Sequence, residues 1–490
     1  MRTRALPEYP SLYQINTRVT LFEIGERLGR PATLDDIPDA QLDQLVEQGF
    51  DWVWFLGVWQ TGAASRAISR SMPELLAEYG SVLPDYREED ICGSCFAINK
   101  YEVHTDFGGD AALARLRERL HQRGLKLLLD FVPNHTSLDH EWTRSHPEFY
   151  VAGTEEQLRN EPKNYIRVGN QILAHGRDPY FPGWSDTLQL NYANPALQAA
   201  MIGELNHVAE RCDGVRCDMA MLILPDVFER TWHQRPEAFW PQAIASVREK
   251  KPEFVFMAEV YWDLEWTLQQ QGFNYTYDKR LYDRLREGQA GPVRGHLHAD
   301  MGFQAKSARF LENHDEPRAA ATFPTEMHRA AAVITFMCPG LRFFHDGQFE
   351  GRKKKVPVHL RRRPVEAVDT ALAEFYRDLL PCVAREQVRA GEWQLLAATA
   401  AWEGNWTSDC FLGFAWSKEG AESLAVVVNY APNQSQCYMR LPIQGGNGKS
   451  ARLVDLMGPH VYERNAEELR TKGLYLDLPP WGYHIFSVKV

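Results

Sequence analysis

The stretch LKLLLDFVPNH, from Leu125 to His135, decides the fold. Its first half is almost wholly apolar, which is typical of a strand buried on both faces of a parallel sheet. Polar residues begin at Asp130, inside this run. The helical pattern just before it, from Asp110 to about Arg123, carries its leucines on one face, with Asp110 as the expected cap. A helix followed by a buried strand predicts a parallel α/β fold.

The same alternation of short apolar runs and helical patterns fills the first two-thirds of the chain. Asn194-Pro195 opens one of these helices as an N-cap followed by proline, and the helix runs to about Arg211. The expected strands are Leu12–Ile15, Asp51–Leu56, Leu125–Val132, Gly214–Asp218, Phe254–Val260, Phe273–Tyr277, Ala308–Leu311 and Leu341–His345. Strands and helices repeated in this way predict a (β/α)8 TIM barrel.

Two regions depart from the alternation. Residues 136–190 are rich in His, Pro, Asn, Gly and aromatic residues and show no sustained period, which indicates an inserted subdomain. After residue 391, short alternating runs such as LAVVVNY indicate a small antiparallel β domain. We therefore expect the barrel in residues 1–135 and 191–390, the insert in 136–190 and a C-terminal β domain in 391–490.

Composition excludes several classes of protein. The 490 residues are 44% hydrophobic and 24% charged, as in ordinary folded proteins, and 54 basic against 65 acidic residues give a net charge of −11. No basic stripe is present, so neither nucleic acid nor a membrane is an expected partner. The basic runs Arg352–Lys355 and Arg361–Arg363 are expected to form a solvated loop face. Eight scattered cysteines, with no signal-like N-terminus, favour the cytoplasm.

Acidic residues recur where the predicted strands end. They are Asp130, Asp218, Glu259 and Asp315, and they are accompanied by Arg216, His135 and His314. In a (β/α)8 barrel the carboxyl ends of all strands meet at one rim, so these side chains are expected to converge. Glycosidic cleavage needs a pair of carboxyl groups, one to attack the anomeric carbon and one to protonate the leaving oxygen. The pattern therefore predicts a glycosidase site.

The surroundings of two acids suggest separate roles. Asp218 lies two residues after Arg216, on the same side of its strand, and we expect the guanidinium to lower the pKa of Asp218 and keep it ionised as a nucleophile. Glu259 ends the apolar run VFMA, where burial is expected to raise its pKa toward that of a useful acid. Surroundings that shift the pKa values of two carboxyl groups in opposite directions are typical of an acid and nucleophile pair.

Four motifs, in this order, resemble those of the α-amylase superfamily, glycoside hydrolase family 13. They are DFVPNH at Asp130–His135, DGVRCD at Asp213–Asp218, FMAEV at Phe256–Val260 and FLENHDE at Phe310–Glu316. The resemblance covers nearly the whole chain and implies a barrel with an inserted domain after its third strand and a C-terminal β-sandwich. It also implies Asp218 as nucleophile, Glu259 as acid/base and Asp315 as a third carboxylate that binds sugar hydroxyls.

The resemblance assigns supporting roles around these three acids. It implies that His135 and His314 hydrogen-bond the sugar. It implies further that Arg216 orients Asp218 and that Asp130 fixes Arg216. The family's stacking aromatic is displaced here, and the segment GSCFAINKY offers Phe96 or Tyr101, of which Phe96 is favoured.

Asn134 corresponds to a calcium ligand in many members of the family. The other ligands cannot be placed in this sequence, so no cofactor is expected to be required and calcium is left open. The expected partner is a small carbohydrate, an α-glucoside.

The sequence departs from the family on the leaving-group side of the site. Many members carry Lys-His shortly after the nucleophile, where Met219 to Leu222 are apolar here. Tyr261 and Trp262 follow Glu259 directly, and we expect Tyr261 to contact the substrate. An apolar wall offers few directed hydrogen bonds, so long chains should gain little there. The alternative is that Met219 to Leu222 only pack under the next helix and that other loops supply the sugar contacts.

The sequence thus predicts a retaining α-glycoside hydrolase that acts on α-glucosidic bonds of short oligosaccharides or small glucosides. A first alternative is an α-glucosyl transferase, isomerase or phosphorylase of the sucrose or trehalose type, because all of these use the same covalent intermediate. A second is a catalytically inactive accessory protein with this fold.

Overall fold

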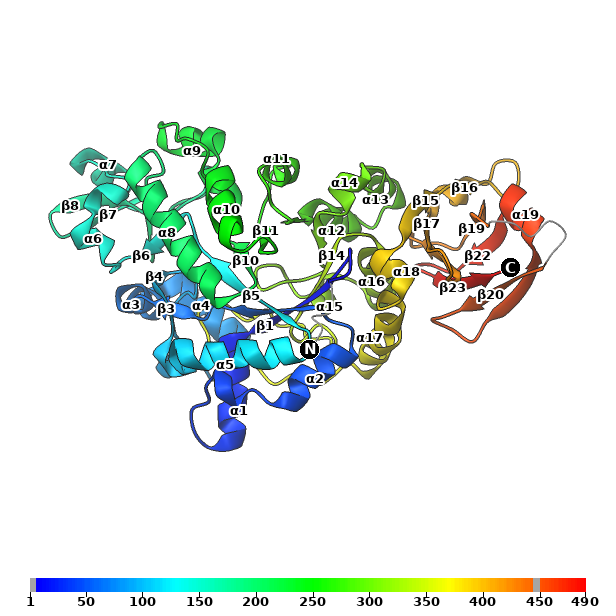
Figure 1. The fold of residues 1–490 in the computed structure, drawn as a ribbon, viewed down its shortest axis with the longest axis horizontal. Helices are drawn as coiled ribbons and strands as arrows, with labels where there is room; N and C mark the ends of the chain where they lie inside the picture. Colours follow the sequence, from blue (N-terminus) through cyan, green and yellow to red (C-terminus); the bar gives the residue numbers. More distant parts are fainter. Residues whose placement is uncertain (1–5, 444–449) are drawn as a thin grey trace.

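A computed structural model describes residues 6–443 and 450–490. Eight parallel strands close into a barrel in which each strand pairs with the next along the chain and the last pairs with the first (Figure 1). The strands are β1 (Ser11–Asn16), β2 (Trp52–Leu56), β5 (Lys126–Phe131), β10 (Gly214–Cys217), β11 (Val255–Ala258), β12 (Tyr275–Tyr277), β13 (Ser307–Arg309) and β14 (Leu341–His345). Each overlaps one predicted strand, and the predicted (β/α)8 barrel is confirmed.

Helices surround the barrel and bury apolar faces against it. They include α1 (Thr17–Leu28), α2 (Asp39–Glu47), α5 (Gly109–Gln122), α8 (Pro195–Arg211), α10 (Phe239–Lys250), α12 (Lys279–Glu287), α16 (Thr325–Met337) and α17 (Thr370–Val383). The predicted start of α8 is confirmed, because the Asn194 side chain accepts a hydrogen bond from the Ala196 amide and Pro195 is the first helical residue.

The predicted cap of α5 is wrong. Gly108, with a φ of 93°, precedes this helix, and Asp110 lies inside its first turn. The carboxylate of Asp110 instead accepts a hydrogen bond from the Val103 amide at 2.9 Å and pairs with Arg211 at 2.5 Å. Asp110 therefore joins α5 to the strand before it and to α8, which a reading of local sequence alone does not reveal.

An insert follows the third barrel strand, as predicted. Strand β6 (His135–Ser137) pairs with β9 (Thr187–Gln189), and β7 (Tyr165–Val168) pairs with β8 (Gln171–Ala174). These strands of three or four residues are joined by the short helices α6 (Trp142–Ser145) and α7 (Glu155–Asn160). Elements this short leave no readable period in the sequence. The domain limits proposed above stay predictions.

The C-terminal region forms two antiparallel sheets (Figure 1, right). The larger sheet has the order β15, β17, β18, β23, β20, β21, and the smaller has the order β16, β19, β22. Their bounds are β15 (Glu392–Leu396), β16 (Ala398–Thr399), β17 (Phe411–Ser417), β18 (Ser423–Asn429), β19 (Ser435–Met439), β20 (Ser450–Asp455), β21 (Val461–Asn465), β22 (Leu474–Leu478) and β23 (Tyr483–Lys489). The Trp416 indole donates a hydrogen bond to the Met337 carbonyl at 2.7 Å, which ties the larger sheet to α16.

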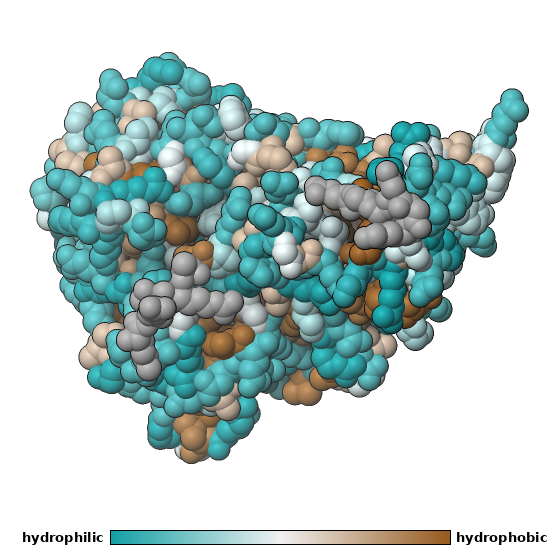
Figure 2. All heavy atoms as spheres, turned by 45° about the vertical axis from the view of Figure 1, so that its right-hand side comes forward, coloured by the Kyte–Doolittle hydropathy of each residue, from teal (hydrophilic) through white to brown (hydrophobic). Residues whose placement is uncertain are grey.

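The surface is mainly hydrophilic on the face shown in Figure 2, with apolar residues scattered over it. Within residues 6–443 and 450–490, no helix combines the length and apolar character needed to cross a membrane. All eight cysteines are free thiols.

Candidate active site

The centre of the site is the guanidinium of Arg216, which β10 places at the carboxyl end of the barrel with no exposed side-chain surface. Its Nη1 lies 2.6 Å from Asp218 and its Nη2 lies 2.7 Å from Glu259. Asp315 is 3.7 Å from Nη2, and Asp130 is 3.9 Å from Nη1. The four predicted acids therefore meet around one buried cation, which offsets much of the cost of burying their charges.

Aromatic rings enclose this guanidinium. The Arg216 Cζ lies 5.1 Å from the ring centroid of Phe96, 5.5 Å from that of Trp54 and 6.0 Å from that of Tyr277. Such contacts stabilise a desolvated cation and restrict its movement. Trp54 and Tyr277 were not predicted as site residues, because they lie inside β2 and β12 and their sequence pattern is that of core residues.

Glu259 is held by two hydrogen bonds besides its ion pair. The Met219 amide donates to its Oε2 at 2.7 Å, and the Tyr261 hydroxyl donates to its Oε1 at 2.8 Å. Burial raises the pKa of Glu259 to about 7; the nearby carboxylates of Asp218 and Asp315 also raise it, and Arg216 opposes them. Glu259 therefore keeps its proton to near-neutral pH, as a general acid requires.

Asp218 differs from the expectation. Burial raises its pKa above the ordinary value, and the contact with Arg216 offsets this effect only in part. The expected lowering is wrong because an almost fully buried carboxylate loses more hydration than one shared guanidinium restores. Asp315 has two-fifths of its side chain exposed; burial raises its pKa, but His314 and Arg216 outweigh that effect and bring the pKa to about 2.

The two predicted histidines lie on different sides of the cluster. The His314 Nε2 is 3.0 Å from the Asp315 carboxylate, and its Nδ1 is 2.9 Å from the amide nitrogen of Gln14 on β1. His135 begins β6 and is buried beside Trp184, with 5.3 Å between ring centroids. Burial lowers the pKa of His135 to about 3, so its ring is neutral and can both donate and accept.

The structure separates the two aromatic candidates. Phe96 is partly buried and lies against both Arg216 and His314, with its centroid 5.4 Å from that of the His314 ring. Tyr101 is 8% exposed and stacks on Phe131 inside the protein, and its hydroxyl donates to the Val132 carbonyl at 3.1 Å. Only Phe96 is therefore placed where it can contact a bound sugar.

Asp130 and Asn134 are both occupied by protein partners. The Gly57 amide donates to the Asp130 carboxylate at 2.8 Å. The side chains of Asn134 and Gln189 exchange hydrogen bonds, one of 3.0 Å and one of 3.2 Å. In the described part of the chain, no group of three or more His, Cys, Asp or Glu side chains is arranged to hold a metal ion. The Asn134 side chain is therefore engaged by Gln189, and the question of calcium, left open above, stays untested.

The apolar residues after Asp218 do not form the expected wall. Ala220 to Leu222 are buried in a short 3-10 helix, and only Met219 is partly exposed. The contribution of Met219 is its backbone amide, which a left-handed conformation with a φ of 41° directs at Glu259. Tyr261 likewise contacts Glu259 directly, while Trp262 packs edge-on against Tyr180 with centroids 5.0 Å apart.

The basic runs after β14 form a solvated loop face only in part: Lys353 and Lys354 are exposed, whereas other members are paired. Arg363 pairs with Glu23 at 2.6 Å and with Asp346 at 2.9 Å, and its side chain is 13% exposed. Arg362 pairs with Asp85 at 2.9 Å, and the Lys355 ammonium donates to the Asp315 carbonyl at 3.1 Å. The loop therefore contacts α1 and the segment between β2 and β5, and it reaches the site at the backbone of Asp315.

Known proteins are similar to this chain in sequence and in fold. Residues 93–378 match the family model described as the catalytic domain of alpha amylase. An alpha-amylase of Haloarcula japonica is 25% identical over 350 residues, which is 70% of this chain and 44% of the relative. An alpha-glucosidase of Culex pipiens is 26% identical over 248 residues, 48% of this chain and 37% of the relative. The chain thus spans less than half the length of these two relatives.

Among solved structures, a noncanonic maltogenic alpha-amylase from Thermotoga neapolitana has the same fold. The two structures superpose with a TM-score of 0.70 at 18% sequence identity, and the match covers 99% of each chain.

Proposed function

Because the chain belongs to the α-amylase family, we propose that it is a retaining α-glycoside hydrolase acting on α-glucosidic bonds of short oligosaccharides or small glucosides. One observation carries this proposal: Arg216 holds Asp218 and Glu259 on its two terminal nitrogens, at 2.6 and 2.7 Å. Two carboxyl groups fixed side by side, one of them protonated near neutral pH, form the pair that retaining cleavage requires.

In the proposed reaction, Glu259 gives its proton to the glycosidic oxygen while Asp218 attacks the anomeric carbon. The bond to the leaving group breaks, and a covalent glycosyl ester forms on Asp218. Glu259, now ionised, takes a proton from water, and the oxygen of that water displaces Asp218 from the anomeric carbon. Two inversions leave the product with the configuration of the substrate. Asp315, ionised and accessible, is proposed to bind sugar hydroxyls together with His314 and His135.

Glucosyl transfer is the second candidate, and one observation favours it. Exposed aromatic rings occur in the segment that follows Glu259 and in its contacts: Tyr180 is 58% exposed and contacts Trp262, and Trp266 is 52% exposed. Aromatic faces stack on sugar rings, so a second sugar or phosphorylated acceptor held there would compete with water for the covalent intermediate. The inactive alternative is not favoured, because all three acids of the proposed triad are present around Arg216.

A panel of neutral substrates tests the proposed function. Wild-type protein is incubated with α-glucosyl fluoride, maltose, maltotriose, sucrose and trehalose, with and without inorganic phosphate. We expect glucose released first as the α-anomer in the NMR spectrum. An initial β-anomer would reject the retaining mechanism, new disaccharides or a sugar phosphate would favour transfer, and inactivity on the fluoride would support an inactive protein.

The eight free thiols also support the proposal that the protein works in the cytoplasm.

A further inference from the structure

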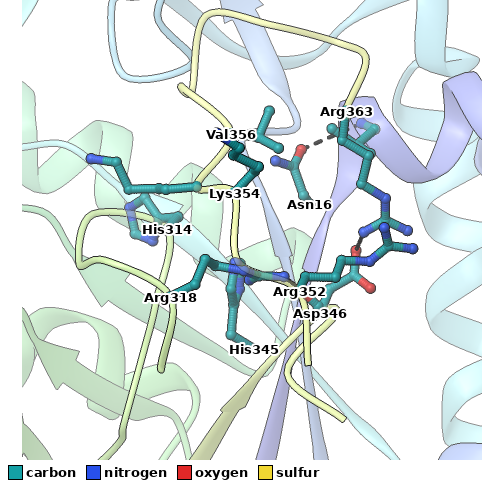
Figure 3. Close-up of a pocket in the computed structure, with 11 residues that line it drawn as sticks. Asn16, His314, Arg318, His345, Asp346, Arg352, Lys354, Val356 and Arg363 are labelled. Carbon is teal, nitrogen blue, oxygen red and sulfur yellow. Dashed lines mark hydrogen bonds and ion pairs between the residues drawn. The ribbon is translucent and has the colours of Figure 1, made fainter. Parts of the chain in front are cut away.

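A small hollow opens at the mouth of the barrel, and Figure 3 shows the residues that line it. Its walls come from the carboxyl ends of three neighbouring barrel strands: Asn16 ends β1, His314 and Arg318 follow β13, and a third segment begins at His345, the last residue of β14. His314, which contacts Asp315, forms part of the wall, so the hollow adjoins the cluster around Arg216.

The hollow is strongly cationic. Five basic side chains and one acidic side chain line it; the basic residues are Arg318, Arg352, Lys354, Lys355 and Arg363, and the acid is Asp346. Burial keeps the pKa of His345 well below its usual range, so that ring in the wall is neutral and adds no charge. Four more positive than negative charges therefore face one small volume.

Within residues 6–443 and 450–490, two of these cations have no side-chain partner, and a third, Lys355, contacts only the backbone carbonyl of Asp315. Arg318 pairs with Glu312 at 2.8 Å, and Arg363 is satisfied by Glu23 and Asp346. For the side chains of Arg352 and Lys354, no ion pair or hydrogen bond occurs within residues 6–443 and 450–490. The Nε of Arg352 is buried without a partner, which is costly unless a ligand completes it.

The loop is built to keep these cations together. Gly347 has a φ of 88°, and a side chain there would clash with the guanidinium of Arg318 and the side chain of Arg352. The Glu366 carboxylate accepts hydrogen bonds from the amides of Lys353 and Lys354, at 2.7 and 3.2 Å. The backbone is therefore fixed on both sides of Arg352, and Figure 3 shows Arg318 and Arg352 close together near His345, with Lys354 beside His314.

We propose that this hollow binds an oxyanion carried by the substrate, the phosphate or carboxylate on C6 of the sugar whose bond is cleaved. Guanidinium groups match both anions in charge and geometry. In TIM barrels the loops after the seventh and eighth strands often build phosphate sites, and β13 and β14 are those strands here. C6 is the exocyclic carbon that bears the charge in both hexuronic acids and hexose 6-phosphates.

The position of the hollow indicates that the anion is carried by the sugar whose bond is cleaved and not by the acceptor. The acceptor must approach Glu259, and Glu259 does not line the hollow. His314 does line it, and the proposed function assigns His314 to binding of the cleaved sugar. This inference rests on the proposed function for its placement of the sugar, but anion binding is measurable without turnover.

Calorimetric titration tests the inference directly. Glucose, glucuronate, glucose 6-phosphate and inorganic phosphate are titrated into wild-type protein and into the double variant Arg352→Gln/Lys354→Gln. We expect at least one of the two anionic sugars to bind wild-type protein at least tenfold more tightly than glucose, and the double variant to lose that ratio. Lys353→Gln is the matched control, because Lys353 is an exposed neighbour that does not line the hollow, and it should keep the ratio.

Two results would overturn the inference. If neither anionic sugar binds tenfold more tightly than glucose, the hollow is not a site for a charged sugar. If inorganic phosphate binds as tightly as glucose 6-phosphate and the double variant loses both, the anion is a free phosphate and not a group on the sugar. Failure of the proposed function gives a different signature, because α-glucosyl fluoride would then stay intact even if an anionic sugar binds.

Discussion

The hydroxyl of Tyr261 donates a 2.8 Å hydrogen bond to the Glu259 carboxyl group. The proposed proton donor is therefore held by a residue only two positions after it in the chain. The bond stabilises the ionised form of Glu259, because a hydroxyl donates to a carboxylate more strongly than to a neutral acid. It thereby works against the burial that raises the pKa of Glu259 to about 7.

Replacing Tyr261 with phenylalanine should move the alkaline side of the pH profile. Without the donated hydrogen bond, the ionised form of Glu259 loses stabilisation and its pKa rises further. A hydrogen bond to a charged group contributes about 1.5 kcal/mol, which corresponds to about one pH unit. We expect the descending limb of kcat/KM against pH to shift upward by about that amount. Tyr180→Phe is the control, since its ring lies nearby without contacting Glu259, and an equal shift in both variants would contradict the argument.

The wild-type profile itself should be bell-shaped. Glu259 must be protonated to act as the acid, so kcat/KM falls as the pH rises through about 7. Asp218 must be ionised to attack, so kcat/KM also falls as the pH drops through its raised pKa. Measured on a neutral glucoside, the profile should have both limbs. Full activity retained two pH units above 7 would show that Glu259 is not the proton donor.

Replacement of each acid should separate the two roles by substrate. Asp218→Asn should lower kcat about 10²–10⁴-fold on maltose and on α-glucosyl fluoride alike, because both need the nucleophile. Glu259→Gln should cost as much on maltose but far less in forming the ester from the fluoride, whose leaving group needs no proton. Pre-steady-state release of fluoride measures that step, and circular dichroism confirms that each variant folds. Equal loss for Glu259→Gln on both substrates would reject its assignment.

Much of this arrangement could be predicted from the sequence. Most barrel strands are short apolar runs. Acids at strand ends, such as Asp218 and Glu259, can be recognised as one site because barrel topology brings those ends together. The long-range contacts were not visible. Trp54 lies within a strand that reads as core, yet its ring faces Arg216. The Met219 amide points at Glu259 because Met219 adopts a left-handed backbone conformation. That conformation is uncommon for a residue other than glycine, and the sequence does not predict it here.

The basic loop shows a second limit of sequence reading. Arg361 to Arg363 have the composition of an exposed segment, and the acids that bind them are remote in the chain: Glu23 lies 340 residues before Arg363. The predicted direction of the Asp218 pKa shift was wrong for a related reason. A neighbouring guanidinium is visible in the sequence, but the extent of burial that competes with it is a property of the packed barrel.

The loop between β14 and α17 should limit the length of substrate that the site accepts. It leaves the barrel after β14 and pairs with the segment between β2 and β5, where Leu360 forms a bridge with Ile91 and the Arg361 amide donates to the Asp90 carbonyl at 3.0 Å. Arg363 fastens its far end to Glu23 and Asp346. A long glucan chain would have to cross this wall, so extra sugar units should add little transition-state binding.

We therefore expect kcat/KM to change less than about tenfold from maltose to maltoheptaose, since tenfold corresponds to about 1.4 kcal/mol of added binding. Arg363→Ala should release the loop and raise the ratio of maltoheptaose to maltose severalfold, because two carboxylates lose their shared partner. Arg377→Ala is the matched control, as Arg377 is exposed on α17 and its one ion pair in the described part of the chain is with its neighbour Asp378. A steep rise along the series in the wild-type protein would mean that the wall does not close the site. An unchanged ratio in Arg363→Ala would mean that this ion pair does not hold it.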